Sequence, residues 1–145
     1  MDDFEKFYIK AAHFLKFRPR SEKEVRDKLK EKKAPPEIIE RIIATLTEQK
    51  FLNDREFARL WVRQRISLKP RSKRIIVLEL RQKGVDKEVI NDVLLDPGED
   101  QEVDDLAQAK KLVSSKIHKY KGFQRQEVYQ KLGGFLARRG FDWDT

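Results

Sequence analysis

The sequence has no cysteine among its 145 residues. This absence excludes disulfide bonds and zinc sites with thiolate ligands, and it fits a reducing compartment. No apolar run approaches the roughly 20 residues that a membrane-spanning helix needs. The segment 1–14 is acidic, where a secretory signal would be basic. We therefore expect a soluble protein that resides in the cytoplasm.

Residues arranged for catalysis are missing as well. The chain has no glycine-rich phosphate loop with a lysine, so nucleotide hydrolysis is unsupported. The two histidines, His13 and His118, lie far apart and near lysines, which favours two surface positions. The acidic pairs at 2–3 and 104–105 come at expected helix starts, where carboxylates interact favourably with the helix dipole. We expect no enzyme activity, no catalytic residue, no metal and no cofactor.

Charge is abundant by contrast. The chain has 33 Lys and Arg against 25 Asp and Glu, which gives a formal net charge of +8 and a pI near 9.7. The segment 55–83 holds ten Lys or Arg and only two acids, Glu56 and Glu79, so its net charge equals that of the whole chain. Such a concentration is an electrostatic footprint. It indicates an anionic partner: nucleic acid, a membrane surface or an acidic protein.

The pattern of segment 52–85 predicts two helices joined by a short basic turn. Asn53 can cap the first helix, and Ser72 can cap the second after Pro70 interrupts the periodicity. Gly84 is placed to end the second helix. The apolar residues predicted to face inward are Phe57, Ala58, Trp61, Val62, Ile76 and Leu80. The basic residues predicted to face solvent are Arg59, Arg63, Lys69, Arg71, Lys73, Arg74 and Arg81.

These seven cations are the strongest functional signal in the sequence. None of them has an acid four residues away, so little helix-surface pairing would have to be broken when they bind an anion. The plain alternative is a solvated helix face. Trp61 and Phe57 could stack on bases, but their inward position favours core packing. We expect the seven cations to form an anion-binding surface.

Apolar residues at helical spacing predict helices along the rest of the chain, and no strand. A capping box of Ser21 and Glu24 begins the second helix. The segment 96–100 has the composition of an acidic linker, and Gly133-Gly134 in the last helix has no explanation from sequence. The stripe of the first helix is Phe4, Phe7, Tyr8, Ala11, Ala12 and Leu15. The stripe of the seventh is Val103, Leu106, Val113 and Ile117, and that of the eighth is Val128, Leu132, Phe135 and Leu136.

An internal repeat organises these helices. A shift of 51 residues places 19–21 on 70–72 with the same Pro-Arg-Ser, and a fainter third copy matches Gly140 with Gly84. We expect an all-α fold of tandem three-helix repeats in an elongated, curved array. The predicted domains are repeat 1 (1–52), the basic repeat 2 (53–96), and repeat 3 (97–145), which lacks its last helix.

Five short motifs then point to a known family. They are Arg-Pro-Arg-Ser-Glu at 18–22, Phe-Leu-Asn-Asp-Arg-Glu-Phe-Ala at 51–58, Lys-Pro-Arg-Ser at 69–72, Glu-Leu-Arg-Gln-Lys-Gly-Val at 79–85, and Ala-Arg-Arg-Gly-Phe at 137–141. The chain resembles the RecX family in these motifs and in their order. The resemblance implies tandem three-helix repeats that bind in the groove of the RecA recombinase filament on DNA. It also implies negative control of recombination and of ATP hydrolysis by that filament, in DNA repair and the SOS response.

The partners expected on this basis are the RecA filament and, more weakly, single- and double-stranded DNA, with the chain acting as a monomer. The resemblance implies no catalytic residues in this chain. A second hypothesis is a stand-alone helical nucleic-acid-binding module without a recombinase target. A membrane-surface binder ranks lower, because the basic residues do not lie opposite a continuous exposed apolar face. The sequence leaves open which cations would touch RecA and which would touch DNA.

Overall fold

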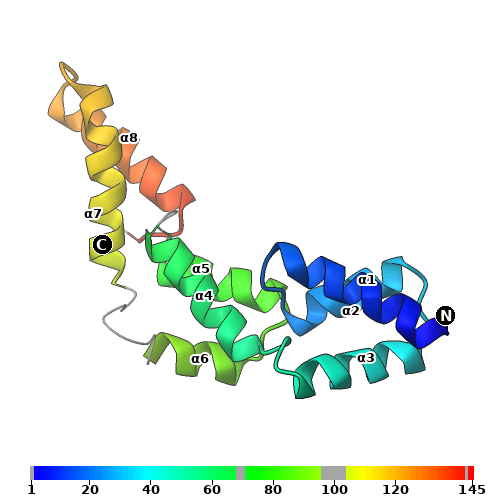
Figure 1. Ribbon diagram of the computed structural model, residues 1–145. Helices are drawn as coiled ribbons and strands as arrows, with labels where there is room; N and C mark the ends of the chain where they lie inside the picture. Colours follow the sequence, from blue (N-terminus) through cyan, green and yellow to red (C-terminus); the bar gives the residue numbers. More distant parts are fainter. Residues whose placement is uncertain (1, 68–70, 96–103, 143) are drawn as a thin grey trace. The chain divides into compact units, whose positions relative to one another are not determined.

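A computed structural model describes residues 2–67, 71–95, 104–142 and 144–145 (Figure 1). Within these residues the chain forms eight α-helices and one 3-10 helix, and no strand, which confirms the all-α prediction. Lys69, Val103 and the predicted linker 96–100 lie outside the described residues. The helices are α1 (Asp3–Phe17), α2 (Glu22–Glu31), α3 (Pro36–Glu48), α4 (Asp54–Ser67), α5 (Lys73–Gln82), α6 (Lys87–Leu95), α7 (Asp105–Lys116), the 3-10 helix η1 (Ile117–Tyr120) and α8 (Arg125–Arg138).

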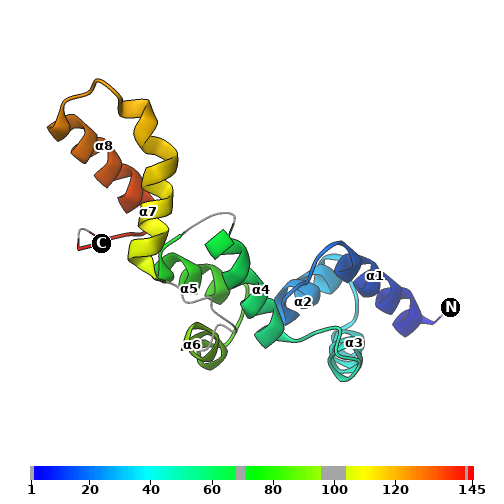
Figure 2. The same cartoon turned by 60° about the vertical axis from the view of Figure 1, so that its left-hand side comes forward.

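The chain divides into two compact units. The first comprises residues 1–58 and 80–90, and the second comprises residues 59–79 and 91–145. In the first unit α1, α2 and α3 pack against one another (Figures 1 and 2). Their buried core consists of Phe7, Ala11, Val25, Leu29, Ala34, Ile39, Ile42, Ile43, Leu46 and Leu52. The predicted stripe of the first helix is right except for Ala12, which is exposed.

The predicted helix starts are confirmed by their hydrogen bonds. Ser21 Oγ accepts from the Glu24 N–H and the Glu24 carboxylate accepts from the Ser21 N–H, both at 3.2 Å, which completes the capping box. Asn53 Oδ1 accepts from the N–H of Glu56 at 3.2 Å. Ser72 Oγ accepts from the N–H of Ile75 at 3.3 Å. Each of these caps satisfies an amide that the first helical turn leaves without a partner.

The second helix of every repeat ends in the same left-handed turn. The residue that makes the turn is Lys33 in repeat 1, Gly84 in repeat 2 and Gly140 in repeat 3, with φ of 66°, 81° and 92°. The next residue is buried and its N–H donates to a leucine carbonyl five residues back, at 3.0, 3.1 and 3.1 Å. This is the helix C-terminal motif in which glycine is usually preferred. Its recurrence agrees with the predicted match of Gly140 to Gly84.

Close packing explains why repeats 2 and 3 need glycine at this turn while repeat 1 has Lys33. A Cβ on Gly84 would lie 2.5 Å from Cβ of Lys23 in repeat 1. A Cβ on Gly140 would lie 2.2 Å from the Ile75 side chain in repeat 2. Repeats 2 and 3 therefore approach the preceding repeat at these glycines, where any larger residue would collide.

In the second unit α7 and α8 form a hairpin whose two arms lie side by side (Figures 1 and 2). The buried side chains between them include Ala109, Leu112 and Phe135. The predicted seventh helix is present as α7, but two of the apolar residues that predicted it, Leu106 and Ile117, are 48% and 51% exposed. The helix instead buries small or polar residues, Ala109 and Gln108, beside Leu112, and a search for large apolar residues does not detect such a face.

The paired glycines of α8 have different surroundings. Gly133 lines a shallow apolar groove along α8, together with Val128, Leu132 and Leu136. A Cβ on Gly134 would lie 3.4 Å from the Arg138 guanidinium, which is a tight contact with a flexible side chain. After α8, the described residues of the chain contain no further helix.

Candidate functional site

Two contacts between consecutive repeats have the same design. The residues of one contact and their equivalents in the other are 51 positions apart in the sequence. Asp54, the first residue of α4, accepts a hydrogen bond from the Glu22 N–H of α2 at 2.9 Å. Asp105, the first residue of α7, accepts one from the Lys73 N–H of α5 at 2.8 Å. Each repeat thus supplies a carboxylate that caps the second helix of the repeat before it. We call these contacts the first and second junctions.

A buried serine gives each junction a second hydrogen bond. Ser21 Oγ donates to the Lys83 carbonyl at 2.6 Å in the first junction. In the second, the Ser72 N–H donates to the Arg139 carbonyl at 3.4 Å. Both serines are completely buried, so their polar groups need these partners.

The two junctions differ in the position of their carboxylate. In the first, the Glu24 carboxylate lies 2.5 Å from the Arg18 guanidinium, 3.5 Å from Lys83 Nζ and 3.8 Å from Arg20. Burial raises the pKa of Glu24, but the Arg18 and Ser21 hydrogen bonds and the charges of Arg18 and Lys83 outweigh it and hold the pKa below its ordinary value. A single carboxylate therefore lies among three cations.

Ile75 stands where the second junction would have the equivalent of Glu24, 51 residues on. The cations remain: Arg71 corresponds to Arg20, and Arg139 follows the same helix end as Lys83. Burial lowers the pKa of Arg71, and the neighbouring charges of Arg65 and Arg139 lower it further. Glu79 raises it only in part. The second junction consequently lacks an equivalent of Glu24, and the carboxylate near Arg71 is Glu79.

Glu79 itself is engaged with the preceding helix. Arg65 Nε donates to its carboxylate at 2.9 Å, and Trp61 Nε1 donates to it at 3.4 Å. The Arg65 guanidinium also lies over the Trp61 ring, 5.1 Å from its centre. The sequence analysis missed the Arg65–Glu79 ion pair, because the two residues are fourteen positions apart. Half-buried Trp61 has this polar role beside its core packing.

The structure describes six of the seven predicted cations. Arg63, Lys73, Arg74 and Arg81 are exposed, as predicted, whereas Arg59 and Arg71 are half-buried. Arg81 belongs to the first unit and the other five to the second. The exposed cations are therefore the accessible part of the predicted surface.

The start of α5 has an unusual charge. It opens with Lys73 and Arg74 and has no acid in its first turn, whereas each of the other seven described α-helices has one. Cations at a helix N-terminus are disfavoured by the dipole, so this placement does not serve the stability of α5. The N–H groups of Lys73 and Ile75 are already bonded to Asp105 and Ser72. An anion at this end would therefore meet side chains rather than those two backbone groups.

Other kinds of site find no support in the described residues. They contain no group of three or more His, Cys, Asp or Glu that could hold a metal ion. None of the described helices is long and apolar enough to cross a membrane. His13 packs edge-on against the Phe17 ring, 5.0 Å between centres, and His118 is exposed.

Comparison with known proteins finds three matched regions in this chain. Residues 8–46, 53–94 and 102–145 match the first, second and third three-helix domains of RecX. Proteins named regulatory protein RecX from Bacillus velezensis and Bacillus subtilis are 33% and 34% identical over 99% of this chain. The chain spans about half the length of these relatives, 54% and 53%.

Solved structures agree with the sequence comparison. The crystal structure of RecX from Lactobacillus salivarius superimposes with a TM-score of 0.79 and 26% identity, over 99% of this chain and 91% of the other. A crystal structure titled regulatory protein RecX gives a TM-score of 0.81 and 29% identity, over 99% and 70%. The fold, the repeated junctions and the three matched domains lead to one conclusion: this chain belongs to the RecX family.

Proposed function

We propose that this chain binds RecA–DNA filaments and negatively modulates the recombinase, slowing ATP hydrolysis, strand exchange and filament extension. The observation that carries the proposal is the presence of all three RecX domains in order along one chain. The chain acts by binding rather than by chemistry of its own. Its place of action is the cytoplasm, as a monomer in DNA repair and recombination.

The contact surface is formed by the predicted cations, Arg59, Arg63, Lys69, Arg71, Lys73, Arg74 and Arg81. Its support is the charge of segment 55–83, which holds ten Lys or Arg and only two acids. The exposed pair Lys73 and Arg74 adds charge at a helix end where it does not favour folding. Phosphates and acidic filament groups are the anions that such cations bind.

A titration tests this function. The protein is added to RecA on single-stranded DNA, and DNA-dependent ATP hydrolysis is followed. We expect inhibition at amounts well below one copy per recombinase subunit, because blocking one filament position affects many subunits. Absence of inhibition at equal amounts would contradict the regulatory function.

The second candidate is a stand-alone nucleic-acid-binding module, which the basic surface alone would also support. Binding to bare single-stranded DNA and to the same DNA coated with RecA separates the two. A regulator should prefer the coated DNA, because only the filament offers both phosphates and protein. Preference for bare DNA, together with unchanged ATP hydrolysis, would favour the module.

A further inference from the structure

The connection between α7 and α8 holds two aromatic rings at the end of the hairpin. The N–H of Phe123 donates to the Tyr120 carbonyl at 3.0 Å. Lys121 has φ of −61° and ψ of 126°, and Gly122 has φ of 90°, which matches a type II turn. The two rings flanking this turn meet edge to face, 5.7 Å between centres. Phe123 is nevertheless 44% exposed, so the turn presents an aromatic face to solvent.

The segment that holds these rings is strongly basic. Segment 106–141 has nine Lys or Arg and a single acid, Glu127, so its net charge is also +8. The net charge of the residues outside 55–83 is zero, because acids at 99–105 and 142–144 offset the cations of this second basic segment. Lys131 Nζ lies 5.9 Å from the centre of the Phe123 ring. In the described part of the chain, Lys119, Lys121 and Lys131 make no ion pair.

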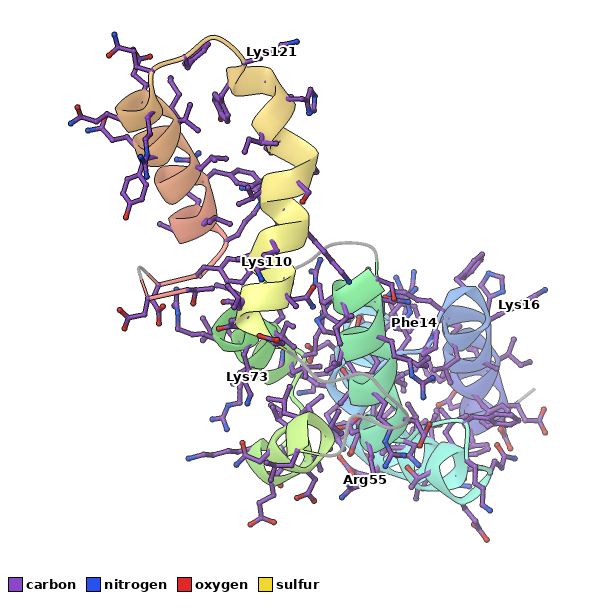
Figure 3. All side chains as sticks on the ribbon, turned by 90° about the vertical axis from the view of Figure 1, so that its left-hand side faces the viewer. Phe14, Lys16, Arg55, Lys73, Lys110 and Lys121 are labelled. Atoms are coloured by element: carbon purple, nitrogen blue, oxygen red, sulfur yellow. The ribbon has the colours of Figure 1, made fainter. Side chains whose placement is uncertain are left out.

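Positive charge continues from this end of the hairpin toward the second junction. The pKa of Lys116 is lowered chiefly by the neighbouring Lys119 ammonium, with a smaller contribution from Arg139. Arg139 in turn lowers the pKa of Arg71. These neighbours link the hairpin end to the predicted surface through cations of the second unit. In Figure 3, Lys121 marks the far end of the hairpin and Lys73 the start of α5, with Lys110 along α7 between them.

We propose that the hairpin end is a second binding site, for single-stranded nucleic acid, in which Phe123 and Tyr120 stack on bases while Lys119, Lys121 and Lys131 contact phosphates. Exposed rings interleaved with cations are the combination that binds single strands without sequence preference. A duplex would use only the cations, since its bases are already stacked. The site does not depend on a recombinase, so bare DNA can test it.

The test uses fluorescein-labelled (dT)20 and a 20-base-pair duplex, with binding followed by fluorescence anisotropy. Phe123→Leu keeps an apolar side chain but removes the ring. We expect it to weaken binding to (dT)20 by roughly 5- to 50-fold, the scale of base–aromatic stacking, and to change duplex binding less than about twofold. Phe51→Leu is the matched control, because Phe51 is 63% exposed in repeat 1. It should change neither affinity.

A charge variant completes the test. The double variant with Lys119→Glu and Lys121→Glu should bind both the single strand and the duplex more weakly. For (dT)20, the slope of log affinity against log salt should become flatter by about 1.4, because two phosphate contacts are lost. The control variant with Lys30→Glu and Lys32→Glu makes the same change in charge at exposed residues near the end of α2. It should weaken binding and flatten the salt slope less. Circular dichroism checks that every variant is folded. Equal losses for Phe123→Leu on single strand and duplex, or no difference between Phe123→Leu and Phe51→Leu, would overturn the stacking site.

Discussion

The first and second junctions share a backbone plan but differ in where their carboxylate stands. Both have a buried serine, an aspartate that caps a helix of the preceding repeat and a glycine packed closely against that repeat. Glu24 lies among the cations of the first, whereas in the second Ile75 stands at the equivalent position and the carboxylate near Arg71 is Glu79. The comparison distinguishes two sets of residues. The serines, aspartates and glycines that both junctions share hold the repeats together, and we expect anion binding to depend on the charged residues, which differ.

The largest effect should come from adding a side chain to the shared glycine. Gly84→Ala adds a Cβ in a left-handed conformation, 2.5 Å from Cβ of Lys23. We expect it to lower the free energy of unfolding by about 2–4 kcal/mol, from backbone strain and collision together. Urea denaturation followed by circular dichroism measures the loss.

Lys33→Gly is the reciprocal control for that comparison. Lys33 has the same left-handed turn, with φ of 66°, so glycine should stabilise it by up to about 1 kcal/mol. Equal destabilisation by the two changes would mean that junction packing does not impose glycine at 84.

A second expected effect concerns the carboxylate of the first junction. Glu24→Gln keeps the size of the side chain but removes the charge that Arg18, Arg20 and Lys83 share. We expect a loss of about 1–3 kcal/mol in unfolding free energy at pH 7, as for hydrogen bonds to charged groups. Glu31→Gln, whose carboxylate is exposed and 3.8 Å from Lys28, should cost far less.

The pH dependence of that loss has a definite sign. The pKa of Glu24 is lowered by folding, so its stabilisation is complete above its ordinary pKa of 4.5 and is lost as the pH falls through the lower folded value. The difference between parent and Glu24→Gln should therefore be constant above about pH 5.5 and shrink below pH 4.5. Asp54 acts in the opposite direction, because burial and, less strongly, the charges of Glu22 and Glu24 raise its pKa, so the same pair is also compared in an Asp54→Asn background. A difference that grows toward low pH would contradict this role of Glu24.

Sequence reasoning recovered what depends on local spacing. The caps at Ser21, Asn53 and Ser72 and the helix end at Gly84 were predicted from residues a few positions apart, and the repeat from the same local pattern recurring 51 residues later. The family resemblance is confirmed as well. What failed depends on distant contacts: the Glu22–Asp54 bond joins residues 32 apart, and the Ser21–Lys83 bond joins residues 62 apart.

Charge was the hardest property to predict for the same reason. A count over segment 55–83 could not show that Arg65 pairs with Glu79, or Lys83 with Glu24. A count of net charge also missed the cations of the α7–α8 hairpin, because acids elsewhere in repeat 3 offset them when the whole repeat is counted. The seven cations remain a prediction as a binding surface, as does an elongated, curved array.

A smaller effect should follow from giving the second junction the carboxylate of the first. Ile75→Glu places a negative charge beside Arg71 and Arg139. We expect weaker binding to the RecA filament, with a salt slope flatter by about 0.7 if one phosphate contact is lost. Ile9→Glu, on α1 and 54% exposed, makes the same change in net charge and should matter less. If the two variants weaken filament binding equally, the cluster at the second junction has no special role.

The most direct test of the account is the affinity for RecA-coated single-stranded DNA after matched charge reversals. One variant changes Arg63, Lys73 and Arg74 to Glu, and the other changes Lys16, Lys30 and Lys32, which are exposed on repeat 1. Both lower the net charge by the same amount and should leave helix content unchanged. We predict that the first weakens binding by more than about tenfold and flattens the salt slope by about 2, while the second has little effect. Equal effects of the two variants, or parental affinity in the first, would contradict the account.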